Sequence, residues 1–180
     1  MARLPYPDVA LKGIPLNVLK LFSYSAATAE YWTKIGAAQF RHLALTNRNR
    51  ELVILLSTSK FQSSYEWTHH ITVSNNEGVT DAQRVVLAKA GNQKGYLLQQ
   101  DKAGQIADLF TPQEKTLLVF LEAVIDEPKV GDDLWARAKA EFSDREIVEI
   151  ITLQGFYYTF SRMTTVLDIE LDVFDSPPKL

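Results

Sequence analysis

Three helix-start signals divide the second half of the chain and restrict what it can fold into. Each pairs Ser or Thr with Gln or Glu three residues later, at 80–83, 111–114 and 143–146. In such a capping box the two side chains satisfy backbone N–H groups in the first turn of a helix. Pro112 strengthens the second signal, because proline suits the first helical position. With the apolar periodicity that follows them, the signals predict helices over 81–90, 112–125 and 144–163.

The rest of the chain follows the same helical periodicity. Leu52 to Leu56 form a nearly continuous apolar run, which is typical of a central helix, and Thr46 or Asn47 can cap it. No alternating strand pattern bounded by turn dipeptides occurs. The sequence therefore predicts one all-α domain over 1–180, with an extended arm at 1–15 and a frayed tail at 175–180. The remaining helical segments are expected over 16–24, 28–43, 48–59, 64–77, part of 92–108 and 132–142.

Composition excludes several classes of function. A net charge of −3 and the lack of a long Lys/Arg run argue against a nucleic-acid partner. No run of about 18 apolar residues is present, and the N-terminus has no apolar signal region, so we expect a cytoplasmic protein without a membrane partner. The chain contains no cysteine. Disulfides, a thiolate nucleophile and a cysteine metal site are therefore ruled out.

The segment 61–79 contains the candidate chemistry. Ser63, Glu66 and His70 are spaced so that they share one face of a helix, among large apolar neighbours. Burial and pairing shift the pKa values of Glu and His, so such a pair can exchange protons with a bound molecule. A structural Glu–His pair on a partly solvated helix is the competing interpretation. Glu51, on the preceding helix, is expected to face the same pocket.

A short internal echo suggests a repeat. Arg50-Glu51-Leu52-Val53-Ile54-Leu55 resembles Arg145-Glu146-Ile147-Val148-Glu149-Ile150, which predicts two related helical hairpins about a pseudo-twofold axis. At the same offset, Tyr158, Ser161 and Thr165 stand opposite Ser63, Glu66 and His70. Tyr157 and Tyr158 are expected to wall a pocket or donate a hydrogen bond there, unless they only pack in the core.

The stretch RELVILLSTSKFQSSYEWTHHITVSNNEGVTDAQ resembles the signature of the carboxymuconolactone decarboxylase family. Its members show an R-E-L-x-I-L helix followed by Y-E-W-x-x-H and a Gly-Val or Gly-Leu turn. The resemblance implies an all-α helical bundle of the alkylhydroperoxidase-like type and a homo-oligomer, either a trimer or a dimer. The residues in register are Arg50, Glu51, Tyr65, Glu66, Trp67, His70 and Gly78.

Alkylhydroperoxidase-like proteins of the same superfamily have a Glu on the first helix and C-x-x-C-x-x-x-H on the second. By position, Glu51 matches that Glu and His70 the histidine, whereas Ser63 and Glu66 stand where the cysteines would be. Thiol peroxidase or disulfide reductase chemistry requires a thiolate. This chain is therefore expected to lack that activity.

The resemblance implies a cofactor-independent enzyme that decarboxylates or protonates a small unsaturated carboxylic acid or lactone. His70 would transfer the proton, Glu66 would tune or relay to it, and Glu51 would orient the histidine or a water molecule. An isomerase, cyclase or dehydratase acting on a natural-product intermediate is one alternative, and a non-catalytic small-molecule-binding oligomer is another. No metal and no cofactor are expected, because two carboxylates and one histidine at these spacings match no closed metal site. The expected substrate-binding residues are Ser63, Tyr65, Trp67 and Tyr158.

Overall fold

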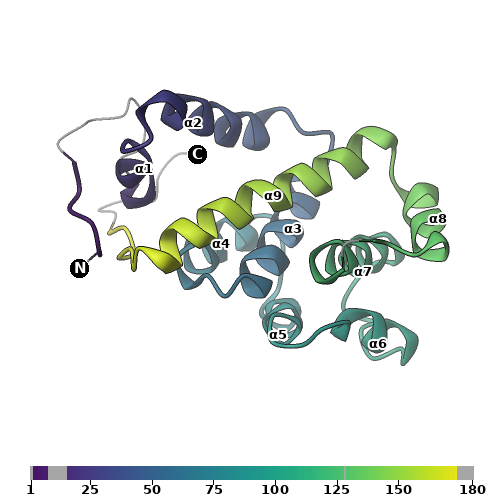
Figure 1. Ribbon diagram of the computed structural model, residues 1–180. Helices are drawn as coiled ribbons and strands as arrows, with labels where there is room; N and C mark the ends of the chain where they lie inside the picture. The colour runs from purple at the N-terminus through teal and green to yellow at the C-terminus, as the bar shows by residue number, and fades with distance from the viewer. Residues whose placement is uncertain (1, 8–15, 128, 174–180) are drawn as a thin grey trace.

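The computed structural model describes residues 2–7, 16–127 and 129–173, and these residues form nine helices and no strand. The all-α prediction is confirmed, and the course of the chain can be followed in Figure 1. None of these helices is both long enough and apolar enough to cross a membrane. In chain order the helices are α1 (Asn17–Phe22), α2 (Ala26–Arg41), α3 (Asn47–Lys60), α4 (Ser64–Asn76), α5 (Asp81–Ala90), α6 (Tyr96–Lys102), α7 (Pro112–Asp126), α8 (Asp132–Glu141) and α9 (Asp144–Val166).

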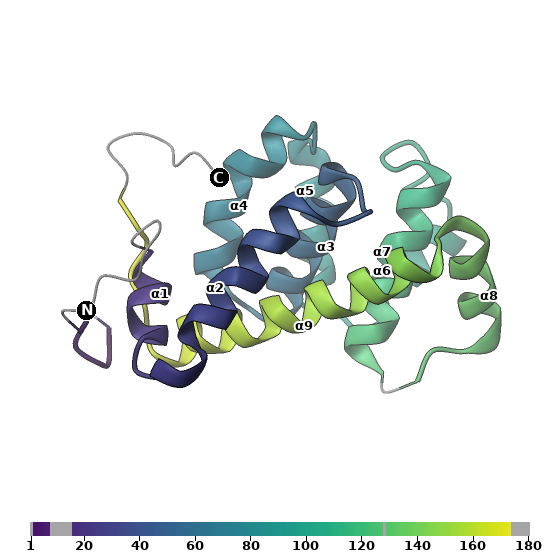
Figure 2. The ribbon, with the colours of Figure 1, turned by 90° about the horizontal axis from the view of Figure 1, so that it is seen from above.

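Helix α3 is the centre of the fold. It packs against α4, α5, α7 and α9, and every residue from Asn49 to Thr58 is buried. A helix that is apolar on all sides must be covered on all sides, and the run Leu52 to Leu56 has this character. Viewed from above, the long helix α9 runs across the middle of the molecule beside α3, against which it packs (Figure 2). Side chains on α3 therefore point into the interior in every direction.

The predicted capping boxes are confirmed, whereas the serine that precedes α4 makes a different contact. Thr80, Thr111 and Ser143 each form a complete capping box, and the Thr46 hydroxyl accepts the backbone N–H of Asn49. Ser63 occupies the N-cap position of α4, but its hydroxyl does not cap the helix. It donates to the side chain of Glu66 instead.

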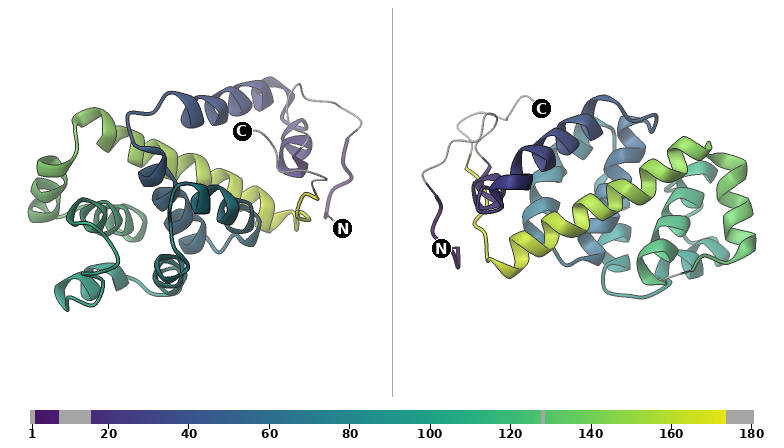
Figure 3. Two further views of the ribbon diagram at one scale, coloured as in Figure 1. Left: turned by 180° about the vertical axis from the view of Figure 1, so that it is seen from behind. Right: turned by 45° about the horizontal axis from the view of Figure 1, so that its top comes forward.

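Helix α2 lies along α9, as Figures 1 and 3 show from opposite sides. Just after α2, the backbone N–H groups of Ala44 and Leu45 donate to the Glu149 carboxylate of α9, at 2.8 and 3.1 Å from Oε2. Burial by itself would raise the pKa of Glu149, but these donors and Arg145 together lower it. Along the helix, Trp32 of α2 packs its ring against Phe156 of α9, with 5.7 Å between the ring centroids.

The predicted second hairpin is wrong. The first copy turns after α3, where Gln62 has a positive φ of 59°, whereas α9 continues unbroken through the corresponding region. The only glycine there, Gly155, lies inside the helix without ending it. The echo is therefore a similarity between two helices, not between two hairpins.

The described parts of the two chain ends lie together. Arg3 N donates to the carbonyl of Leu167 at 2.8 Å, and Ala2 N donates to Glu170 at 3.0 Å. Residues 2–7 contain no helix, and the extended arm over 1–15 stays a prediction. The remainder of that arm, 8–15, and the predicted frayed tail, 175–180, lie outside the described residues.

Candidate functional site

Three helices bring three polar side chains into one buried chain of hydrogen bonds. Oε2 of Glu51, on α3, lies 2.7 Å from Nδ1 of His70, on α4. The other ring nitrogen of His70, Nε2, lies 2.9 Å from the hydroxyl of Tyr157 on α9. Glu51 is fully buried, and Tyr157 and His70 are 4% and 8% exposed. The predicted meeting of Glu51 and His70 thus exists, and Tyr157 extends it.

Arg50 determines how the protons in this chain are arranged. Its Nε donates to Oε1 of Glu51 at 3.0 Å, and its guanidinium lies 4.4 Å from the ring centroid of Phe40. Because a guanidinium stays protonated, Glu51 is the acceptor in this pair. Nδ1 of His70 then carries a hydrogen and donates it to Glu51, while Nε2 accepts from the hydroxyl of Tyr157. The tautomer follows from the partners of the ring.

Tyr157 remains a neutral phenol in this environment. Burial is the first cause that raises its pKa well above the usual value, and the negative charges of Glu51 and Glu66 act in the same direction. A phenolate would be both desolvated and repelled by these carboxylates. The hydroxyl can therefore pass a proton on only if another group replaces that proton at the same time.

Glu66 belongs to a second cluster beside the first. Its oxygens accept from the Thr164 hydroxyl, 2.9 Å from Oε2 and 3.1 Å from Oε1, and from the Ser63 hydroxyl. Burial raises the pKa of Glu66, while the hydrogen bonds from the two hydroxyls oppose the rise. The hydrogen bonds of the Glu66 carboxylate thus go to Ser63 and Thr164, and its relay role toward His70 stays a prediction.

The other predicted substrate-binding residues lie elsewhere. The Tyr65 hydroxyl donates to Asp172, in the segment after α9, and Trp67 is partly buried against the core. Tyr158 is 47% exposed and meets the ring of Phe61 edge-on, 5.1 Å between centroids. The structure does not bring these three side chains to the hydrogen-bond chain around His70.

Sequence reasoning named Tyr157 together with Tyr158 as a possible hydrogen-bond donor, and it missed Thr164. Tyr157 contacts His70 and Thr164 contacts Glu66, whereas the internal echo had aligned the neighbouring Tyr158 and Thr165 with the site residues of the first copy. The pattern of buried and exposed positions along α9 shows which side chains of this helix face the site. Phe156, Tyr157 and Phe160 are buried, and this pattern places Tyr157 on the inner face.

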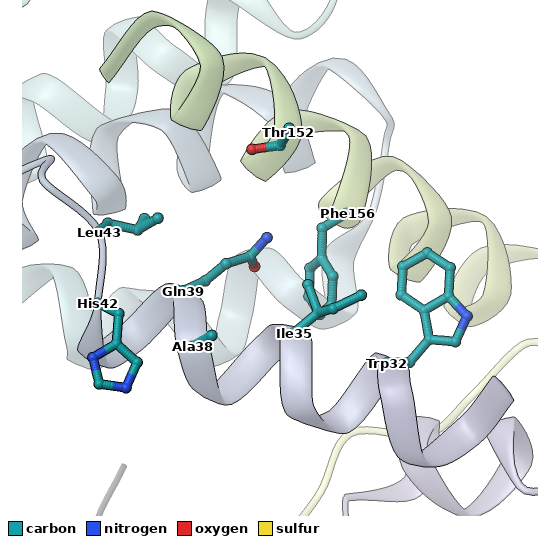
Figure 4. A pocket seen from close by; sticks show the side chains of 8 residues that line it. All are labelled: Trp32, Ile35, Ala38, Gln39, His42, Leu43, Thr152 and Phe156. Atoms are coloured by element: carbon teal, nitrogen blue, oxygen red, sulfur yellow. The ribbon is translucent and has the colours of Figure 1, made fainter. Parts of the chain in front are cut away.

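A groove lies between α2 and α9, close to this site (Figure 4). It has a volume of about 500 Å³, and its surface is almost entirely apolar. Figure 4 shows the Gln39 side chain reaching from α2 toward Thr152 of α9, with Leu43 toward one end and Trp32 at the other. The lining residues are Trp32, Ile35, Ala38, Gln39, His42, Leu43, Thr152 and Phe156.

Metal-binding residue types do not gather in the described part of the chain. Among residues 2–7, 16–127 and 129–173, no three His, Asp or Glu side chains lie together in a group that could hold a metal ion. The pair Glu51–His70 takes its further contacts from Arg50 and Tyr157 instead.

Comparison with solved structures identifies the fold. No protein-family model and no curated protein matches the chain. An uncharacterized peroxidase-related protein from a Silicibacter species superimposes with a TM-score of 0.73 at 13% identity, covering 95% of this chain and 92% of that one. The alkylhydroperoxidase AhpD core of a peroxidase-related protein from Ralstonia eutropha gives 0.66 at 15% identity, with coverages of 95% and 92%. The debrominase Bmp8, in complex with 2,3,4-tribromopyrrole, gives 0.68 at 12% identity, with 89% and 79%. The protein therefore has the AhpD-like fold.

Proposed function

We propose that this protein is a cofactor-independent enzyme that transfers a proton to or from a carbon atom of a small molecule. The chain Glu51–His70–Tyr157 carries the proposal, because it joins a buried carboxylate, an imidazole and a phenol through contacts of 2.7 and 2.9 Å. The resemblance to carboxymuconolactone decarboxylases supports it, since Glu51 and His70 are both part of that signature. Thiol chemistry is excluded, because the chain contains no cysteine.

The proton would move through Tyr157 in a single concerted step. In the base direction, the phenol oxygen takes a proton from the substrate while its own proton passes to Nε2 of His70. The imidazolium that forms is stabilised by the carboxylate of Glu51. In the acid direction, every step is reversed. Tyr157 stays neutral throughout, as its raised pKa requires.

Decarboxylation of an unsaturated acid or lactone is the first reaction to test. The bond to the carboxylate carbon breaks, carbon dioxide leaves, and the electron pair enters the conjugated carbonyl as an enolate. Because decarboxylation consumes one proton, Nε2 of His70 first takes up a proton from solvent. The imidazolium then gives this proton to Tyr157 while Tyr157 gives its own to the substrate carbon. A positioned acid of this kind is worth about 10²- to 10⁴-fold in rate.

Isomerisation, cyclisation or dehydration of an uncharged substrate is a second candidate. It is favoured by the groove beside the site, whose lining contains no Lys or Arg to pair with a substrate carboxylate. The same proton relay would serve, but no carbon dioxide would be released. A small molecule that binds and returns unchanged would instead favour the non-catalytic binding protein.

The test uses conjugated lactones and their carboxylic acids in heavy water, with detection of both carbon dioxide and deuterium in the recovered carbon skeleton. We expect His70→Ala and Tyr157→Phe each to slow turnover by about 10²-fold or more. Tyr158→Phe is the matched control, because it removes the same hydroxyl from an exposed position one residue away. Normal turnover in Tyr157→Phe would contradict the relay, and normal turnover in His70→Ala would contradict the function itself.

A further inference from the structure

The groove between α2 and α9 contains a buried hydrogen-bonding group without a partner. Oε1 of Gln39 has no hydrogen-bond partner within the described residues, and the residue is 7% exposed. Figure 4 shows this side chain directed from α2 into the groove. A buried polar atom left unpaired costs free energy, so native proteins rarely keep one without a reason. A bound molecule with an O–H or N–H group would provide the missing donor.

The rest of the lining defines the class of that molecule. Trp32, Ile35, Leu43 and Phe156 provide aromatic and aliphatic walls, and no Asp, Glu, Lys or Arg lines the groove. A charged ligand would lose its hydration there, and the exposed imidazole of His42 is the one ionisable side chain of the lining that could pair with it. The volume of about 500 Å³ lies within the range of sites that hold small organic ligands. An uncharged ring system with one polar group fits these walls.

Two aromatic contacts connect the groove to the proton-transfer chain. Phe156, in the groove lining, lies edge-on to Tyr157 with 5.5 Å between ring centroids. Phe40, the residue after Gln39, stacks on the ring of His70 at 6.1 Å. A molecule in the groove therefore touches Phe156, which contacts Tyr157, and lies one residue along α2 from Phe40, which contacts His70.

We infer that this groove binds an uncharged, largely apolar small molecule whose hydrogen-bonding group pairs with the amide of Gln39. That this molecule is the substrate of His70 rests on the proposed function, whereas its binding does not. The inference narrows the substrate class to neutral ring compounds, such as lactones, ketones or phenols, and so favours isomerisation, cyclisation or dehydration over decarboxylation. A free carboxylate would find no Lys or Arg in the groove lining and only His42 as an ionic partner.

The test uses three probes of nearly the same shape: 2-naphthol, 2-methylnaphthalene and 2-naphthoate. Binding is followed by NMR, through the side-chain amide signals of Gln39 and the indole N–H of Trp32, which lies in the lining. We expect 2-naphthol to bind about fivefold more tightly than 2-methylnaphthalene, the usual net value of one hydrogen bond. The charged 2-naphthoate should bind most weakly of the three.

Three variants of α2 make the test specific. Gln39→Leu should remove the preference for 2-naphthol over 2-methylnaphthalene without removing binding. Ala38→Trp should fill the groove and abolish binding, whereas Ala37→Trp, one exposed position away and outside the lining, should not. His70→Ala should keep full binding, so that a failure of the catalytic proposal does not hide the result.

The outcomes are distinct. No shift of the Gln39 and Trp32 signals, the tightest binding by 2-naphthoate, or equal binding in Ala38→Trp would each overturn the inference. If no probe binds and Ala38→Trp changes the mass measured by light scattering, the groove is covered by a second copy of the chain and the inference is wrong. The site would be established if the wild type binds the probes in the expected order, Gln39→Leu loses the preference for 2-naphthol, and binding disappears in Ala38→Trp but not in Ala37→Trp.

Discussion

Replacing Glu51 by Gln is expected to destabilise the protein strongly as well as to impair proton transfer. Glu51 is fully buried and accepts from two partners, Arg50 at 3.0 Å and His70 at 2.7 Å. A Gln side chain has a single acceptor oxygen, so its NH₂ group must face one of these donors. Arg50, which is 5% exposed, would then be a buried charge without a counter-ion.

The magnitude follows from breaking a buried pair. Removing one partner of a buried ion pair costs about 3–5 kcal/mol, because the other charge remains uncompensated. Arg50 keeps its contacts with the carbonyl of Phe40 and with Asn47, so we expect about 3 kcal/mol. For a chain of 180 residues, this corresponds to a fall in Tm of about 6–12 °C.

A double-mutant cycle isolates the charge effect. Urea unfolding of Glu51→Gln, Arg50→Met and the double variant gives three free energies of unfolding. The double variant should be more stable than the sum of the single losses predicts, by about 1–3 kcal/mol, because no uncompensated charge remains. A loss below about 1 kcal/mol in Glu51→Gln, or additive losses, would refute this account of the buried pair.

Three further outcomes are expected. Burial raises the pKa of Glu66, so between its unfolded-state and folded-state pKa values the folded protein binds more protons than the unfolded chain, and the free energy of unfolding should fall as pH rises through this window. Glu66→Gln should remove that fall when urea unfolding is measured from pH 4 to 8. The same pH dependence in Glu66→Gln as in the wild type would contradict this account. Gly91→Ala should lower the free energy of unfolding by about 3 kcal/mol, because the new Cβ would lie 2.7 Å from the carbonyl oxygen of Ser59. Gly155→Ala, where the new Cβ would meet open space, should raise the free energy of unfolding by about 1 kcal/mol. Thermal unfolding of both variants measures these changes. Finally, the purified protein should not consume peroxide and should be insensitive to thiol alkylation, because the chain has no cysteine. Robust peroxidase activity in the purified, metal-free protein would refute this argument.

The helical architecture could be predicted from local signals. Thr80, Thr111 and Ser143 begin helices because a side-chain oxygen at the N-cap satisfies a backbone N–H within the same turn. Such a contact involves residues only three positions apart, so it is visible in the sequence. The burial of α3 was equally clear, since a run from Leu52 to Leu56 cannot remain in water.

The site was predictable only where its residues are close in sequence or part of a recognised motif. The face shared by Ser63 and Glu66 follows from helical spacing, and the pairing of Glu51 with His70 was expected from adjacent helices. Tyr157 is 87 residues away from His70, and Thr164 is 98 away from Glu66. Their contacts depend on how α9 is rotated about its axis, which packing of the whole domain decides.

The burial of α3 has a consequence for the time scale on which the site can be disturbed. Amide hydrogens in a helix covered on every side exchange with solvent only when the surrounding helices separate, so those of α3 should be among the slowest in the protein. Glu51 lies on this helix, whereas the groove is bordered by α2, at the periphery. Local opening at α2 can therefore admit a molecule from solution while the carboxylate that orients His70 stays fixed until the domain unfolds.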